Sequence, residues 1–362
     1  MEWIQKSYQV ILIPVLIFIL SSCASSSFDE SILEQNAADQ DVLSDTFIVE
    51  EQKKMGELPP DKHLIAKRIK MQKEAAVSGK TREAGQKKRK DLLAKTPFII
   101  SADPKWAEQE VKSQEIWQKF SPAYLKEGER HILNVSFSKI HAATTILEIR
   151  PLQRYQSRDV FHFHARAKTA DYYSWIYQLN DTIDTLVDKE FFVPWKYSLL
   201  QREKNKSIDD IQFYDRKSLM TYAFYKKVKN EKTEQDKRSE AIPFFGQDYY
   251  SSFYFIRGLP LNVGDHYLFP ATTKANTWLM SVKVIGKEMV SIGLGKFSSI
   301  KVEIISKYSG DFAKKGSVFA WFSDDEHRAL LSAKAEVKIG SIQAELAEYR
   351  VKDKLIFGKV EK

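Results

Sequence analysis

The sequence predicts a mainly β protein built on one antiparallel sheet, with one buried helix against it. Apolar and polar residues alternate with a period of two, as in Leu133–Phe137 and Phe161–Lys168, and this indicates strands with one buried and one wet face. Short turn sequences such as Asn180-Asp181 and Gly340-Ser341 separate the strands, which indicates an antiparallel meander. Hydrophobic residues make up 43% of the chain and aromatic residues 12%, enough for a sizeable core.

The N-terminal residues 1–22 predict a cleavable signal peptide. Lys6 and the free amine precede an uninterrupted apolar run over Val10–Leu20. This run is shorter than the roughly 20 residues that span a bilayer and has the length of a signal-peptide core. The next residues, Ser21-Ser22-Cys23, resemble the lipobox of bacterial lipoproteins. The resemblance implies cleavage before Cys23 and acylation of Cys23, with palmitate as a typical acyl group.

The rest of the chain is consistent with an anchor at Cys23, although an ordinary signal peptide followed by an incidental thiol is the alternative. Cys23 is the only cysteine, so no disulfide framework within the chain is possible. Ala24 follows it, and resemblance to the enterobacterial sorting rule then implies the periplasmic face of the outer membrane. We expect the membrane as a partner through the anchor, and no nucleic acid. The net charge of +8 either keeps the exported protein soluble or attracts anionic envelope polymers.

Residues 23–96 predict a flexible charged tether between the anchor and the folded part. Residues 24–52 contain Asp and Glu but no Lys or Arg, whereas residues 53–95 are rich in Lys and Arg, as in Lys87-Lys88-Arg89-Lys90. One-sign charge and few aromatics do not support a packed core, so we expect disorder or a frayed helix. As a random coil, such a tether would span roughly 50 Å.

Two helices are expected, the first within residues 97–124. Asp103-Pro104 has the pattern of an N-cap followed by proline at the first helical position,. This amphipathic segment should pack against the β-rich domain of residues 125–362. The second helix begins after Asp248 and ends at Gly258, which we expect in a left-handed turn,. Its aromatic residues face nearly every side, so the helix should be buried. The charged stretch Lys226–Glu240 is expected to be a long hairpin loop.

Several blocks of sequence, in this order and spacing, resemble the bacterial exported family catalogued as domain of unknown function 3108. The blocks span about residues 125–348 and include Gly128-Glu129, Ala165–Thr169, Ile176-Tyr177 with Asp181 and Asp184, Asp248 with Ser251, Tyr254 and Arg257, Leu259–Leu261, Gly264-Asp265, Trp321–Asp325 and Ile339–Ile342. The resemblance implies a curved antiparallel sheet, a half-barrel or clam, wrapped around a helix. The family brings no established activity with it.

Ser251, Tyr254 and Arg257 are the candidate ligand contacts. They step by three along the second helix and share a slowly drifting face. A hydroxyl, a phenol and a guanidinium there could meet a carboxylate or phosphate headgroup at the mouth of a cavity. In the alternative, Arg257 pairs with a sheet carboxylate such as Glu288 and fixes the helix in place.

No motif commits the chain to a chemical reaction, so we predict no catalytic residue, no cofactor and no enzyme. His162 and His164 have a spacing that can ligate zinc, with His141 as a conceivable third ligand,. However, Arg166 and Lys168 continue the same face and oppose a cation, so a solvated or strand-paired face is predicted. Asp324-Asp325, on adjacent positions, point oppositely and are expected in a turn.

The function that these features favour is non-enzymatic binding of a hydrophobic or lipid-like ligand in a cavity between sheet and helix. The alternative is a structural or assembly lipoprotein that binds another cell-envelope protein. The 22 Phe, 16 Tyr and 7 Trp of the chain could fill the interior, so the two hypotheses differ in whether this interior is open or packed.

Overall fold

The computed structural model describes residues 104–137, 139–169, 178–203, 206–307, 317–337 and 340–359, which belong to one compact unit. The predicted signal peptide, Cys23, the tether and residues 97–103 lie outside the described residues. Of the helices described, none is long and apolar enough to cross a membrane.

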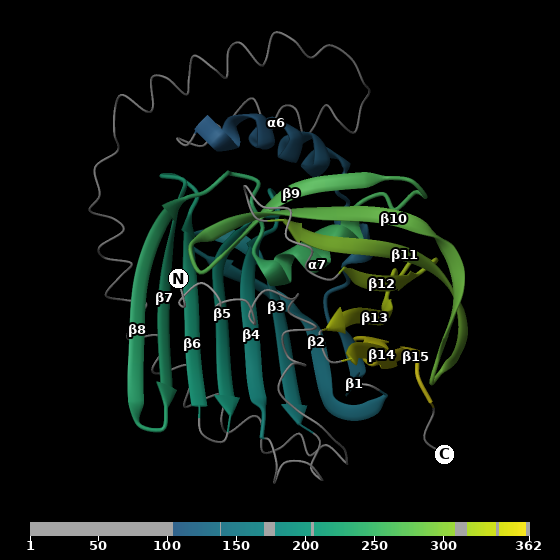
Figure 1. The fold of residues 1–362 in the computed structure, drawn as a ribbon. Coiled ribbons are helices and arrows are strands. Elements are labelled where there is room, and N and C mark those ends of the chain that lie inside the picture. Colours follow the sequence, from purple (N-terminus) through teal and green to yellow (C-terminus); the bar gives the residue numbers. More distant parts are fainter. Residues whose placement is uncertain are drawn as a thin grey trace, which may run out of the picture. The chain divides into compact units, whose positions relative to one another are not determined.

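The described strands form one antiparallel sheet of 15 strands, so the predicted mainly β fold is confirmed (Figure 1). The first meander contains β1 (Glu129–Phe137), β2 (Ile140–Tyr155), β3 (Arg158–Thr169), β4 (Asn180–Asp188), β5 (Pro194–Glu203), β6 (Lys206–Asp215), β7 (Met220–Lys229) and β8 (Lys232–Ala241). The second contains β9 (His266–Thr273), β10 (Asn276–Ile292), β11 (Gly295–Lys307), β12 (Val318–Ser323), β13 (Leu330–Val337), β14 (Gly340–Val351) and β15 (Lys354–Phe357).

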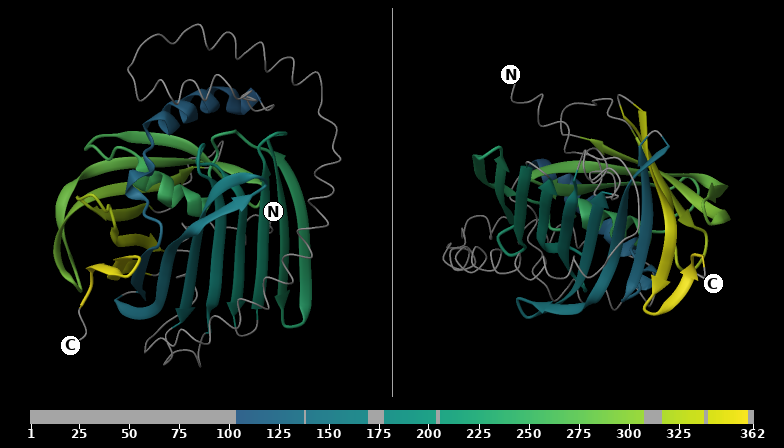
Figure 2. Two further views of the ribbon diagram at one scale, coloured as in Figure 1. Left: turned by 180° about the vertical axis from the view of Figure 1, so that it is seen from behind. Right: turned by 90° about the horizontal axis from the view of Figure 1, so that it is seen from below.

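The two meanders are joined by one non-sequential pairing, between β1 and β14. The order β8-β7-β6-β5-β4-β3-β2-β1-β14-β13-β12-β11-β10-β9 leaves β8 and β9 as the two ends of an open sheet. The sheet curves around one helix, as the clam-like expectation implies (Figures 1 and 2).

The enclosed helix is α7 (Tyr249–Gly258), which lies between the two meanders in the sequence. Asp248 caps it, because its carboxylate accepts a hydrogen bond from the Ser251 backbone while the Ser251 hydroxyl binds back to the Asp248 backbone,. All 10 residues of α7 are buried. The predicted burial of this aromatic helix is therefore confirmed.

Gly258 is the last residue of α7, but the expected left-handed turn is wrong. It is absent from the described glycines with positive φ. Instead, a Cβ at this position would lie 2.1 Å from Cε2 of Phe120 and 2.8 Å from the Ser121 carbonyl oxygen. Glycine is required here because the segment after the first helix passes directly over the end of α7, where the Ser121 N–H donates to the Gly258 carbonyl at 2.7 Å,.

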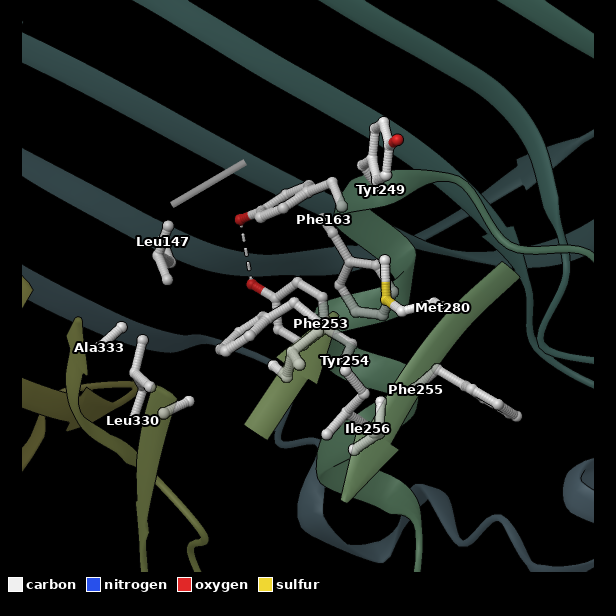
Figure 3. Close-up of a cluster of buried hydrophobic side chains, with 14 of the residues drawn as sticks. Leu147, Phe163, Tyr249, Phe253, Tyr254, Phe255, Ile256, Met280, Leu330 and Ala333 are labelled. Atoms are coloured by element: carbon white, nitrogen blue, oxygen red, sulfur yellow. Dashed lines mark hydrogen bonds between the residues drawn. The ribbon is translucent and has the colours of Figure 1, made fainter. Parts of the chain in front are cut away.

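Aromatic rings from the sheet and from α7 pack in direct contact around the helix (Figure 3). Phe163 stacks on Tyr254 with ring centroids 3.9 Å apart. Phe255 meets Phe269 of the second meander at 5.1 Å. The face of the sheet that carries Phe163 and contacts α7 is called the inner face below.

The first helix, α6 (Pro104–Lys119), packs against the domain as predicted, and a short 3₁₀ turn (Pro122–Tyr124) follows it. Trp117 is buried against Phe245, with ring centroids 5.2 Å apart. Gln109 donates to the Leu268 carbonyl at 2.7 Å and so covers part of edge strand β9. Gln247 pairs with the same edge through its backbone.

The expected loop at Lys226–Glu240 is wrong: these residues form the paired strands β7 and β8 around a turn at Asn230 and Glu231. Both faces of the hairpin meet water, so no apolar alternation marks its strands. Charges on both faces instead form cross-strand pairs such as Lys227 with Glu234 at 2.9 Å. Such charges also discourage edge-to-edge association of an exposed terminal strand.

Candidate functional site

The structure places Ser251, Tyr254 and Arg257 inside the core, each fully buried. The Ser251 hydroxyl accepts from the Asp248 N–H at 2.9 Å. The Tyr254 hydroxyl lies 3.2 Å from that of Tyr250 and donates to the Glu148 carbonyl at 3.4 Å. All three side chains thus have polar partners within the protein, and they lie together only as a stripe on α7.

Arg257 forms a buried ion pair with Glu129 at the start of β1. Its Nε donates to the Arg328 carbonyl at 3.0 Å and its Nη2 to the His327 carbonyl at 3.1 Å. The Tyr349 hydroxyl of β14 donates to Glu129 at 3.2 Å. Burial alone would lower the pKa of Arg257, but the Glu129 carboxylate outweighs it and holds that pKa above its ordinary value.

The expected type of partner, a sheet carboxylate, is correct, but the predicted residue, Glu288, is wrong. Glu288 accepts from the indole of Trp321 at 2.6 Å and lies 3.3 Å from Nζ of Lys301, on a more exposed part of β10. Glu129 belongs to the first motif of the domain, and no sequence pattern links it to Arg257. Only the β1–β14 pairing and the position of α7 bring the two charges together.

Asp324 and Asp325 form a turn, as predicted. One oxygen of Asp325 accepts from the backbone N–H groups of His327 at 2.9 Å and Arg328 at 3.0 Å. Asp324 instead pairs with Lys287 at 2.7 Å. The two carboxylates therefore serve different local contacts.

His162 and His164 point away from α7, on the outward face of β3. One oxygen of Asp184 on β4 lies 2.6 Å from Nε2 of His162 and 2.7 Å from Nδ1 of His164. Burial would raise the pKa of Asp184, but the two imidazoles outweigh it and lower that pKa. No direct sequence signal marks this grouping, because Asp184 comes from the next strand, opposite His164 in the register. His141 is not part of the group.

Several buried carboxyl groups hold loops and helices in place. Glu110 of α6 accepts from the N–H groups of Phe244 at 2.9 Å and Phe245 at 3.2 Å, and burial raises its pKa to about 7. Burial likewise raises the pKa of Asp181 to about 7 and that of Asp248 to about 6. Each of these groups caps backbone or side-chain donors, so their arrangement is explained by folding.

The chain was compared with curated proteins, solved structures and models of protein families. A search of curated proteins finds no match. A β-barrel-like protein of domain of unknown function DUF1849 from Brucella abortus aligns at 10% identity and a TM-score of 0.41, over 62% of this chain and 97% of that one. A candidate lipoprotein from Parabacteroides distasonis aligns at 11% identity and a TM-score of 0.28, over 62% and 95% of the respective chains.

A candidate exported protein with a YmcC-like fold from Bacteroides fragilis aligns at 12% identity and a TM-score of 0.29, over 62% of this chain and 96% of that one. The model of the DUF3108 family, described as a protein of unknown function, matches residues 133–347, which is more than half of the chain. The chain therefore belongs to the DUF3108 family.

Proposed function

We propose that this protein is a non-enzymatic lipoprotein of the bacterial envelope whose folded domain serves as a structural or assembly module. A lipid on Cys23 would hold it at the periplasmic face of the outer membrane, and the outer surface of the domain would bind another envelope protein. The observation that carries the proposal is the packing of α7, the element expected to line a ligand cavity.

An acyl-chain carrier needs open space between helix and sheet. Here all 10 residues of α7 are buried, and the stack of Phe163 on Tyr254 places aromatic rings where a chain would lie. The polar stripe that would meet a headgroup is occupied by Glu129 and by backbone carbonyls. The packed interior therefore favours the assembly hypothesis over the carrier hypothesis.

The same contacts argue against chemistry at the stripe. Ser251 is engaged in the capping box, and burial raises the pKa of Tyr254 far above its ordinary value. A buried hydroxyl without an adjacent general base is a poor nucleophile. The role of the stripe is to fix α7 between the two meanders.

The test is a search for bound lipid. The full mature chain with Cys23→Ser, which lacks the anchor, is purified from the periplasm without detergent and compared by native and denaturing mass spectrometry. We expect equal masses and an organic extract free of stoichiometric lipid. A bound lipid at one per chain would overturn the proposal in favour of the carrier hypothesis.

The partner is sought by photo-crosslinking in living cells. Photoreactive residues replace exposed positions of the second meander, such as Ile285 and Met289, which are 47% and 63% exposed. Gln235 on the charged strand β8 provides the matched position on the other meander. We expect a discrete adduct from one meander and none from the other. Equal, diffuse labelling at all positions would contradict a specific assembly surface.

A further inference from the structure

Two imidazoles and one carboxylate converge on the outward face of β3 and β4, away from the α7 stripe. His162, His164 and Asp184 each offer one ligand atom, and these atoms all lie within 4.8 Å of one another. Both rings meet the same oxygen of Asp184, at 2.6 and 2.7 Å. The two histidines alternate with core residues along β3, so the strand itself aims both rings to the same side.

The burial of the three groups is uneven in a way that suits a bound ion. His162 and His164 are only 9% and 3% exposed, so their rings have little freedom to turn away. The side chain of Asp184 is 33% exposed, which leaves one side of the cluster open to water. A rigid pair of nitrogen ligands beside a solvent-accessible carboxylate resembles an open, three-ligand metal site.

We propose that His162, His164 and Asp184 form a binding site for a divalent transition metal ion of the zinc class. Two nitrogens and one carboxylate oxygen are ligands that such ions accept, with a water molecule in the fourth position. In a tetrahedral zinc site with bonds of about 2.0–2.1 Å, the ligand atoms lie about 3.3 Å apart. The nitrogen–oxygen distances of 2.6 and 2.7 Å would open by about 0.6–0.7 Å to reach this spacing, and the two nitrogens already lie within 4.8 Å of each other,.

Two side chains beside the proposed ligands, Gln153 and Arg166, must adjust when a metal ion binds. Nδ1 of His162 lies 3.0 Å from the side-chain amide of Gln153, and this amide can turn so that its oxygen accepts the ring N–H of a metal-bound histidine. Nε2 of His164 accepts a hydrogen bond from Nε of Arg166 at 3.0 Å. A metal on Nδ1 would put a proton on Nε2, so Arg166 must swing away.

Several cations lie near the cluster and oppose a bound ion. Glu148, opposite His164 on β2, is shared by Arg130 at 3.4 Å and Arg150 at 3.7 Å. Arg166 directly contacts a proposed ligand, through Nε2 of His164. Arg166 should lower the affinity of the site for a metal ion. A change in affinity when Arg166 is replaced therefore distinguishes a metal site from a purely structural hydrogen-bond network.

The experiment uses the full mature chain with Cys23→Ser, which removes both the lipid and the one competing thiol. Zn²⁺ binding is measured by calorimetry, and Co²⁺ binding by its visible absorption. We expect one ion per chain. We expect His164→Gln and Asp184→Asn to weaken binding by at least the 10–100-fold typical of lost second-shell support. His141→Gln, on the same sheet but outside the cluster, is the matched control and should bind normally.

Arg166→Gln tests the site without replacing any of the three proposed ligands. Removal of the opposing guanidinium should strengthen Zn²⁺ binding by about 10-fold. Thermal unfolding without metal checks that each variant folds. Failure of the parent chain to bind Zn²⁺, or binding that is equal in parent, His164→Gln and Arg166→Gln chains, would overturn the metal site. This result would leave the assembly proposal unaffected, because that proposal rests on the packing of α7.

Discussion

At the scale of single residues, the polar side chains of α7 show how a functional pattern in sequence can be a folding device. Three polar residues at a spacing of three on an aromatic helix are compatible with a headgroup site. In the structure, Arg257 is surrounded by Glu129 and by three backbone carbonyls, those of Tyr124, His327 and Arg328. Sequence indicates that such an arginine needs an anionic partner. It does not indicate which one, because Glu129 is 128 residues away.

This ion pair gives the first prediction. Glu129→Gln removes the charge but keeps the shape, and it leaves the Arg257 guanidinium buried without its counterion. Loss of one partner of a buried pair costs about 3–5 kcal/mol, so the free energy of unfolding should fall by that order in urea titrations. Glu288→Gln, at the partner expected from sequence, should change stability by less than about 1 kcal/mol. Equal effects of the two changes would contradict the assigned pairing.

At the scale of elements, a strand can be predicted from sequence where one of its faces is buried and the other meets water. β3 has a buried face of Phe163 and Ala165 and an outward face of polar residues, so its alternation is visible. Between Lys226 and Glu240, β7 and β8 bury no residue on either face, and their charges hide the same strand geometry. The β1–β14 pairing that unites the meanders has no local sequence signal, since its register depends on residues more than 200 positions apart.

The docking of α6 gives a prediction for pH. Burial raises the pKa of Glu110 to about 7 from an ordinary value of 4.5. Between these two values the folded state binds the proton more strongly than the unfolded state, so this group makes stability fall as pH rises from about 4.5 to 7. Glu110→Gln keeps an acceptor for the N–H groups of Phe244 and Phe245 but removes the titration.

The measurement is the difference in unfolding free energy between the parent chain and Glu110→Gln at several pH values. The comparison is needed because His131 acts in the opposite direction: burial and the charge of Arg257 lower its pKa. The stability of the variant relative to the parent should rise across pH 4.5–7 and level off above it. A difference that is constant with pH would show that Glu110 does not titrate in this range.

At the scale of the whole molecule, the interior is packed, so we expect the binding surface on the outside of the domain. A curved sheet around a helix is compatible with a carrier, and sequence alone could not decide, because the same aromatic residues can line a cavity or fill it. Here Phe163 of β3 stacks on Tyr254 of α7, and Phe255 of α7 meets Phe192 and Phe269. The outward faces of the domain are therefore what another molecule would meet.

The proposed anchor at Cys23, which would set the position of the domain in the cell, gives the last prediction. In the parent chain, Cys23 should carry palmitate label, and the protein should remain with the membrane fraction after a high-salt wash. Cys23→Ser, exported behind a signal peptide that is cleaved without a lipobox, should lose the label and move to the periplasmic fraction, because without acyl chains no membrane anchor remains. Ala24→Asp, the matched control, should keep the label and shift the protein from the outer to the inner membrane. Retention of unlabelled Cys23→Ser protein in salt-washed membranes would instead show that the folded domain or the basic residues 53–95 bind the membrane directly.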